Sequence, residues 1–198
     1  LKNERRIIAD HYDGASILFA DMVDFTPMSA KMTPVETVAL LDMIFSDFDL
    51  LVEKYDLEKI KTIGDCYMVA SGVPRPRSDH AQAIVRLALD IRDYIQIHDF
   101  GTDRPIAFRI GVNSGPVLAG VIGRKKFIYD LWGDAVNVAS RMESHGVPGS
   151  VALSEAAWSR ICHLGEADVS ERIQIKGLGE QQVLIFRRFH DPLTARGE

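Results

Sequence analysis

The chain has 198 residues, of which 46% are hydrophobic and 26% are charged, and its formal net charge is -5. This length predicts one domain with an apolar core, and the acidic balance gives no support to a nucleic-acid-binding protein, which would carry a basic surface. The two cysteines are too few for a disulfide framework, and no uninterrupted apolar run is long enough to span a membrane.

The first twelve residues are polar and charged, and we interpret 1–12 as a lead-in segment. The main domain is expected at 13–190, followed by a short tail at 191–198. No secretory signal is visible, so we expect a cytoplasmic domain. The chain begins with Leu1 rather than Met, which leaves room for an upstream membrane or sensor region and for a membrane-anchored whole protein.

The first half of the chain predicts a strand, a helix and a hairpin. Residues 15–20 form an apolar run typical of a buried strand. Thr33 and Glu36 have the spacing of a capping box, and Pro34 suits the first position of a helix that reaches about residue 55. Its buried face is expected to carry Val38, Leu41, Phe45, Phe48 and Val52. Residues 59–63 and 65–70 are expected to be strands joined at Gly64.

A second helix is expected to begin at Asp79, with its buried face formed by Ile84, Leu87, Ile91 and Ile95. Strands are expected at 106–112 and 117–122, on either side of a turn at 113–116. A third helix is expected to begin at Gly133 and Asp134 and to reach about residue 145. A short helix near 154–161 and strands near 173–176 and 182–189 follow. This order predicts an α+β fold with a ferredoxin-like βαββαβ core and additional strands and helices.

Two acidic residues lie at the edges of strand-like runs. Asp21 ends the first apolar run, and Asp65 follows Gly64. Either residue alone is more often an ordinary turn residue. Together they would supply the carboxylate oxygens that Mg²⁺ prefers, and the turn after Asp21 could offer backbone N–H groups to phosphate. The pair therefore indicates phosphoryl or nucleotidyl chemistry.

Five further polar residues stand out, although each also fits an ordinary structural role. Lys61 lies in a strand, Asp130 lies in an apolar segment, and a buried Asp130 would need a partner. Asn137 and Arg141 are four residues apart and share one helix face, and Lys176 ends a strand. The histidines show no spacing typical of metal ligands. We therefore interpret His80, His98 and His145 as surface or cap residues.

Five stretches together resemble the class III nucleotidyl cyclase catalytic domain: FADMVDFT at 19–26, KTIGDCYM at 61–68, FRIGVNSGPVLAGVIG at 108–123, YDLWGDAVNVASRME at 129–143 and IKGLGE at 175–180. The resemblance extends from about residue 10 to residue 189. It is strongest to bacterial adenylate cyclases that resemble the mammalian membrane-bound enzymes. It implies a fold of the nucleotidyl cyclase type, synthesis of cyclic AMP from ATP for signal transduction, and a homodimer with two Mg²⁺ or Mn²⁺ ions per site.

The resemblance also implies roles for the polar residues. Asp21 and Asp65 match the metal-binding aspartates, and Lys61 and Asp130 match the pair that reads adenine. Adenine offers an acceptor at N1 and a donor at N6, which a lysine and a carboxylate complement. Guanylate cyclases typically carry Glu at the position of Lys61 and a small residue at that of Asp130, so both positions favour ATP.

The remaining matches concern the ribose and the triphosphate. Asn137 and Arg141 match the pair that orients the ribose and stabilises the transition state, and Lys176 matches the lysine that holds the terminal phosphates. The family's phosphate-contacting turn is matched by the backbone of Met22, Val23, Asp24, Phe25 and Thr26. Lys125 lies where the family often has another basic residue that binds phosphate. Two positions depart from the family pattern: Asp24 replaces a glycine, and Leu178 replaces a residue that is often basic.

The spacing from Lys61 to Asp65 predicts a shared site. The Cα atoms of a hairpin pair lie on the order of 5 Å apart, yet one residue is expected at the base and the other at the phosphates. In a two-fold dimer, one chain would provide the acids and the other would provide Lys61 and the residues that act with it. Two alternatives remain: a guanylate cyclase, and a non-catalytic domain of this fold used for dimerisation or nucleotide sensing.

Overall fold

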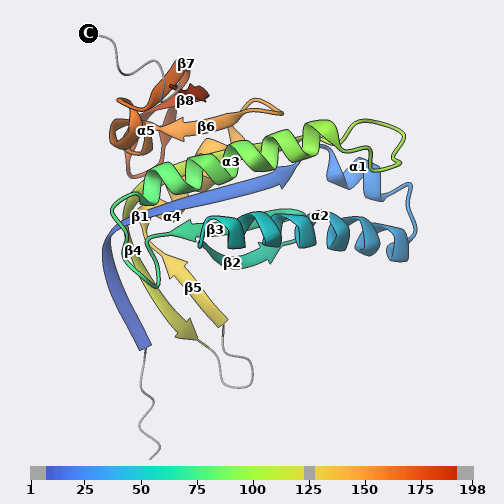
Figure 1. The fold of residues 1–198 in the computed structure, drawn as a ribbon, viewed down its shortest axis with the longest axis horizontal. Coiled ribbons are helices and arrows are strands. Elements are labelled where there is room, and N and C mark those ends of the chain that lie inside the picture. Colours follow the sequence, from blue (N-terminus) through green and yellow to red (C-terminus); the bar gives the residue numbers. More distant parts are fainter. Residues whose placement is uncertain (1–7, 123–127, 191–198) are drawn as a thin grey trace, which may run out of the picture.

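The computed structural model describes residues 8–122 and 128–190. The first half of this part contains β1 (Ile8–Met22), α1 (Phe25–Ser29), α2 (Pro34–Lys54), β2 (Glu58–Ile63), β3 (Cys66–Ser71) and α3 (His80–Ile97). The second half contains β4 (Phe108–Ile122), β5 (Ile128–Trp132), α4 (Asp134–Ser144), β6 (Val151–Ser154), α5 (Glu155–Ile161), β7 (Gly165–Ile175) and β8 (Gly179–Phe189). Figure 1 shows the long β1 strand running through the centre of the molecule.

The strands form one mixed sheet with the order β2-β3-β1-β4-β6-β8-β7. The eighth strand, β5, pairs only with β4 and is not part of this linear order. β1 lies antiparallel to both β3 and β4, whereas β6 joins β4 in parallel. The first six elements of the core, β1, α2, β2, β3, α3 and β4, confirm the predicted βαββαβ arrangement. β5, β6 and α1 are additions that the sequence patterns do not predict as separate elements.

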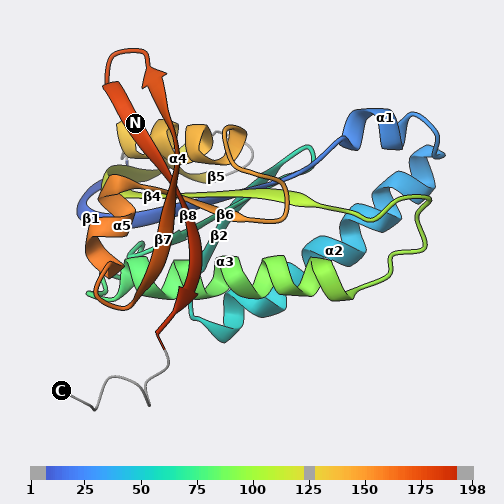
Figure 2. The same ribbon diagram turned by 90° about the horizontal axis from the view of Figure 1, so that it is seen from above.

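Alternation along β1 divides the apolar core between the two faces of the sheet. Leu18 and Ala20 face the cluster that contains α2 and α3, and Ile17 and Phe19 face the cluster that contains α4. Figure 2 shows α2 and α3 on one side of the sheet and α4 on the other. Asp21 continues the second set, because side chains two residues apart share a face. Its carboxylate therefore lies on the α4 side.

The predicted turn at 113–116 is wrong, because β4 runs without interruption from Phe108 to Ile122. The polar side chains of this segment are buried and bonded internally. Asn113 Nδ2 donates to the carbonyl oxygen of Ala135 at 2.8 Å, and Ser154 Oγ donates to Asn113 Oδ1 at 2.5 Å. Polar residues such as Asn113 usually favour turns, but this one fits a central strand because hydrogen bonds to Ala135 and Ser154 satisfy its side chain.

The start of α2 confirms the predicted capping box. The Glu36 amide donates to Thr33 Oγ1 at 3.2 Å, and the Thr33 amide donates to Glu36 Oε2 at 2.8 Å. The predicted buried face is only partly correct, because Val38 is 66% exposed while Leu40 is buried. The true buried set is Leu40, Ile44, Phe45, Phe48 and Val52.

Three further expectations can be compared with the structure. The predicted buried residues of α3 are all confirmed. Strand β1 begins at Ile8, inside the segment interpreted as a lead-in. His80 is buried rather than exposed. In the part of the chain that the structure describes, no helix combines the length and apolar character needed to cross a bilayer.

Candidate active site

The two predicted metal-binding acids, Asp21 and Asp65, lie at the same end of the paired strands β1 and β3. We call this end of the strands the acidic edge. Asp21 near the end of β1 is paired with Cys66 of β3 on one side and with Arg109 of β4 on the other. Asp65 precedes Cys66 in the tight turn between β2 and β3, where Gly64 adopts φ 63°. Residues opposite one another on antiparallel strands share a face. The register thus pairs Asp21 with Cys66, the residue after Asp65, and the charge of Asp65 is near enough to raise the pKa of Asp21.

The electrostatics of this edge suit a divalent cation. Burial and the nearby Asp65 carboxylate raise the pKa of Asp21, while Arg109 and the Cys66 thiol oppose that rise. Burial also raises the pKa of Asp65. A bound cation would relieve the cost of holding two carboxylates close together. The described residues contain no cluster of three or more metal-ligating side chains, so the other ligands would be water and phosphate oxygens, as is usual for Mg²⁺.

Two charged residues that the sequence reasoning missed adjoin these acids. Arg109 lies directly opposite Asp21, and the buried carboxyl group of Glu143 lies at the end of α4. Burial and the charges of Asp21 and Asp65 raise the pKa of Glu143 to about 7, against an opposing effect of Arg109. The strand alternation that places Asp21 could have identified Arg109, once β1 and β4 were known to pair. Glu143 has no comparable signal, because its place depends on how α4 packs.

Lys61 and Asp130 form an ion pair, with 2.5 Å between Lys61 Nζ and Asp130 Oδ2. The other carboxylate oxygen of Asp130 accepts a hydrogen bond from the Leu131 amide at 2.9 Å. In the sheet, β3, β1 and β4 lie between β2 and the strand β5 that carries Asp130. The arm formed by the end of β4 and β5 must therefore curl back toward β2, as Figure 1 shows.

Helix α4 presents Asn137 and Arg141 on its exposed side, opposite the buried Val138 and Met142. Neither exposed side chain has a hydrogen-bond or ion-pair partner among residues 8–122 and 128–190. This placement agrees with the predicted shared helix face. Both side chains are therefore available to a ligand or to a second molecule.

The turn between β7 and β8 contains the exposed Lys176. Two positions later, Leu178 packs against the cluster that includes Val138 and Met142 of α4. This apolar contact gives Leu178 a packing role at a position where the resemblance leads us to expect a basic residue. It also attaches the hairpin that carries Lys176 to the helix that carries Asn137 and Arg141.

The predicted phosphate turn contains fewer available amides than expected. The Val23 amide donates to the carbonyl oxygen of Ala107 at 2.9 Å, so it is already committed to the sheet. The amides of Asp24, Phe25 and Thr26 remain, and the last two are in the first turn of α1, where N–H groups have no acceptor within the helix. Lys125 lies outside the described residues.

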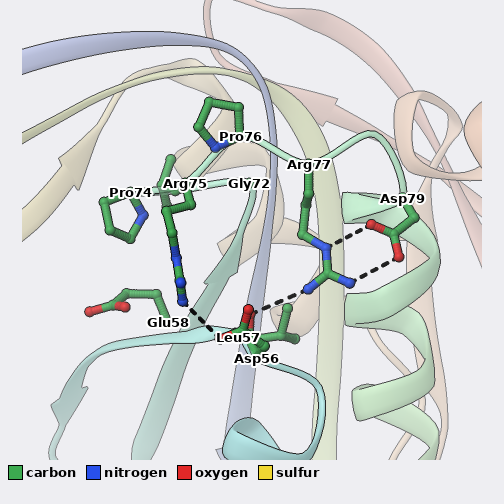
Figure 3. A pocket seen from close by; sticks show the side chains of 10 residues that line it. Asp56, Leu57, Glu58, Gly72, Pro74, Arg75, Pro76, Arg77 and Asp79 are labelled. Atoms are coloured by element: carbon green, nitrogen blue, oxygen red, sulfur yellow. Dashed lines mark hydrogen bonds and ion pairs between the residues drawn. The ribbon is translucent and has the colours of Figure 1, made fainter.

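Two surface hollows are lined by residues other than Asp21 and Asp65, although the larger one includes Met22, Val23 and Asp24, which follow Asp21. Figure 3 shows the smaller one, of about 350 Å³, where Arg77 binds both carboxylate oxygens of Asp79 and Arg75 pairs with Asp56. These carboxylates already neutralise both arginines, so this hollow is a poor triphosphate site. The larger hollow, of about 600 Å³, lies between α1, α2 and the segment before β4, and apolar residues make up much of its lining.

The candidate residues thus form three groups: the acids Asp21 and Asp65, the ion pair between Lys61 and Asp130, and the α4 side with Lys176. No hydrogen bond or ion pair within the described part of the chain joins one group to another.

Comparisons with known proteins identify the family of this chain. The family model described as the adenylate and guanylate cyclase catalytic domain matches residues 7–187. An adenylate cyclase from Mycobacterium tuberculosis is 45% identical over 197 residues, which are 98% of this chain and 44% of that protein. The rat guanylate cyclase soluble subunit beta-2 is 42% identical over 91% of this chain and 27% of its own length. The chain thus spans less than half the length of these curated relatives.

The guanylate cyclase domain of RhGC from Catenaria anguillulae, solved in complex with GTP, superimposes with a TM-score of 0.87 at 32% identity. The similarity covers 91% of this chain and all of that one. The family match and the confirmed βαββαβ core lead to the same assignment. This chain belongs to the adenylate and guanylate cyclase catalytic domain family.

Proposed function

We propose that this chain converts ATP to 3′,5′-cyclic AMP and pyrophosphate, in the cytoplasm and as a homodimer with two shared sites. The observation that carries the proposal is the ion pair between Lys61 and Asp130. The pair sets a donor beside an acceptor, which matches N1 and N6 of adenine. Guanine presents a carbonyl and a protonated N1 at the same places, so it would leave both side chains without correct partners.

Each group of residues has a distinct task in this reaction. Asp21 and Asp65 would hold two Mg²⁺ or Mn²⁺ ions, whose chemistry is to make the ribose 3′-hydroxyl more acidic and to neutralise the triphosphate. The 3′-oxygen forms a bond to the α-phosphorus while the bond to the β-phosphate oxygen breaks, and the hydroxyl proton passes to solvent. Pyrophosphate leaves with the electron pair of the broken bond.

Residues from the α4 side complete the proposed site. Arg141 offers planar N–H donors to the charge that develops on the α-phosphate oxygens. Asn137 orients the ribose, and Lys176 binds the terminal phosphates together with the free amides of Asp24, Phe25 and Thr26. Lys125 is proposed as an additional phosphate contact.

The positions of Lys61 and Asp65 support a shared site. Both lie in one hairpin, so their Cα atoms lie within about 14 Å even if the chain were fully extended between them. The register pairs Lys61 with Met68 and leaves Asp65 in the turn, and the side chain of Lys61 is already committed to Asp130 on the β4–β5 arm. One nucleotide could hardly engage the ion pair through its base and Asp65 through its phosphates.

An exposed apolar surface around Asp130 supports a second copy as the partner. The register pairs Leu118 with Trp132 and Ile122 with Ile128, on both sides of the pair formed by Gly120 and Asp130. Ile122 is 55% exposed, and the other three residues of these two pairs are also partly exposed. Burying this surface against a second copy would stabilise a dimer and place the base-reading pair at its interface.

A guanylate cyclase is the second candidate, because the similarity to the rat guanylate cyclase subunit is almost as high as that to the mycobacterial adenylate cyclase. The polarity of Lys61 and Asp130 argues against it.

The deciding experiment supplies the purified chain with ATP or GTP, each with Mg²⁺ or Mn²⁺, and detects the cyclic products by chromatography. We expect cyclic AMP from ATP and little cyclic GMP. A preference for GTP would refute the base-reading argument, and nucleotide binding without turnover would support the non-catalytic alternative. An Asp65→Ala variant serves as the inactive control.

A further inference from the structure

Glu143 is a buried carboxylic acid for which the proposed reaction provides no role. Its side chain is on the last turn of α4, and the residue is only 8% exposed. No hydrogen-bond or ion-pair partner for its carboxyl group occurs within the described ranges. Its carboxyl oxygens are not among the fully enclosed side-chain atoms without a partner, so they keep some access to solvent, and a nearby cation could compensate their charge.

The packing of α4 on the sheet explains how Glu143 reaches this position. A Cβ atom at Gly111 of β4 would lie 1.9 Å from the Glu143 backbone nitrogen and 2.5 Å from its Cα. Only glycine at position 111 permits this approach. The backbone of Glu143 therefore rests directly on the sheet, at the strand position opposite Phe19.

The acidic edge lies on the same face of the sheet, at the next pair of residues along β1 and β4 whose side chains point to that face. Asp21 and Arg109 are each two residues from the pair formed by Phe19 and Gly111, a distance of about 7 Å along the strands. The Glu143 side chain can span that distance. Consistent with this placement, the groups that shift the pKa of Glu143, besides burial, are Asp21, Asp65 and Arg109.

We infer that Glu143 is a positioning residue of the acidic site, a third carboxylate that binds no cation directly but strengthens the hold of Asp21 and Asp65 on divalent cations. The inference rests on the proposed function in taking the two aspartates as metal ligands. Glu143 lies outside any cluster with direct metal-ligand geometry, so it acts through its negative charge and through Arg109. A charge in a partly buried site acts more strongly than one on the surface.

The test compares Glu143→Gln, which keeps the shape and removes the charge, with Glu143→Asp, which keeps the charge. The matched control is Glu53→Gln, the same change at an exposed position of α2. Binding of Mn²⁺ alone is measured at about pH 8, where Glu143 with its pKa of about 7 is mostly ionised, by electron paramagnetic resonance of the free ion, with Asp65→Ala to define the site. Thermal unfolding midpoints are recorded for every variant without metal.

For Glu143→Gln we expect Mn²⁺ affinity to fall about tenfold, the equivalent of one pKa unit of interaction. Its unfolding midpoint should stay equal or rise, because a buried charge has been removed. Glu143→Asp should stay within about threefold of the unchanged chain. Unchanged Mn²⁺ affinity in Glu143→Gln would overturn the inference, as would an equal loss in Glu143→Asp. If Glu143→Gln does not fold, Glu143→Ala, which also removes the charge, is judged by the same tenfold loss of Mn²⁺ affinity.

Activity separates this inference from the proposed function. If the unchanged chain makes no cyclic nucleotide but Glu143→Gln still weakens Mn²⁺ binding, the proposed function fails and the role of Glu143 stands. If the chain cyclises ATP and both Glu143 variants bind Mn²⁺ normally, the function stands and the role of Glu143 fails.

Discussion

Asp24 has a backbone conformation that glycine adopts more easily. Its φ of 57° and ψ of 29° lie in the left-handed region, and its side chain makes no capping hydrogen bond to α1. Aspartate tolerates this region better than most residues. The departure from the family pattern at this position is therefore compatible with the turn that glycine would form.

We predict that Asp24→Gly improves nucleotide binding. The change relieves backbone strain on the order of 1 kcal/mol, and it removes a negative charge beside the free amides of the turn. The KM for ATP should fall several-fold, while the turnover number changes little. Steady-state kinetics at fixed free Mg²⁺ measure both values.

Asp24→Asn is the matched control, because it removes the charge but keeps a residue that tolerates the left-handed region. If Asp24→Asn lowers the KM as much as Asp24→Gly does, charge rather than backbone strain is the cause. An unchanged KM in both variants would contradict the proposed proximity of this turn to the triphosphate.

At the scale of helices and strands, local patterns predict elements well where one face is buried in a regular way. The spacing of Ile84, Leu87, Ile91 and Ile95 correctly predicts the buried side of α3, and the capping box correctly predicts the start of α2. The buried side of α2 is predicted less well. Apolar residues surround much of that helix, and Val38 remains exposed.

Tertiary partners explain the elements that the sequence misses. Asn113 and Ser114 favour a turn by composition, but inside β4 their side chains bond to other segments. The contact between Lys61 and Asp130 joins residues 69 positions apart. The resemblance implied this pairing, whereas local patterns could not show that the β4–β5 arm curls back. Arg109 and Glu143 were missed for the same reason, since register and helix packing place them.

The close contact between α4 and β4 leads to a second prediction. In Gly111→Ala, the new methyl group would overlap the backbone of Glu143 and force the end of α4 away from the sheet. We expect a loss of stability on the order of 3 kcal/mol and a loss of most cyclase activity, because Arg141 lies on the displaced helix. Chemical denaturation and the cyclic-product assay measure the two effects.

Gly14→Ala is the control for this prediction. It also adds one methyl group to a glycine, but the nearest atom there, Nε2 of His80, is 3.4 Å away, an ordinary contact. Its stability should therefore change little. If Gly111→Ala folds with unchanged stability and activity, α4 does not need to rest on the sheet as closely as the structure shows.

At the scale of the whole molecule, the buried His80 predicts how stability depends on pH. His80 Nδ1 lies 2.7 Å from Ser16 Oγ, which in turn lies 2.6 Å from Ser114 Oγ. Burial, with Arg160 and Arg77, lowers the pKa of His80 to about 4, and Asp79 only partly opposes this. The fold therefore favours neutral His80, whose contribution is complete above an unfolded pKa of about 6.5 and is lost as the pH falls toward 4.

We expect about 2 kcal/mol of stability to be lost through His80 over this pH range. His80→Gln should be less stable than the unchanged chain at pH 7.5 but should lose less stability between pH 6.5 and pH 4.5. Urea unfolding at several pH values measures this difference. The exposed His163→Gln serves as the control, and parallel pH profiles for the unchanged chain and His80→Gln would refute the role of His80.

The last prediction concerns the assembly of two chains. If one chain supplies Asp21 and Asp65 and the other supplies Lys61 and Arg141, each homodimer of a single variant lacks one essential group in both sites. Asp65→Ala and Arg141→Ala should therefore each be inactive alone, at less than about 1% of normal activity, because each removes more than about 3 kcal/mol of transition-state stabilisation. In a mixed dimer, one site would combine both changes and the other would contain none.

Mixing the two variants should consequently restore activity, to about a quarter of the unchanged level if chains exchange at random: half of the dimers are mixed, and each has one intact site. Mass spectrometry of differently tagged chains must confirm that mixed dimers form. A mixture of Asp21→Ala and Asp65→Ala is the control, because both changes affect the same group and every dimer would have two damaged sites. Mixed dimers of Asp65→Ala and Arg141→Ala without activity would show that each chain uses its own acids and its own Arg141. The exposed apolar surface around Asp130 would then need another explanation.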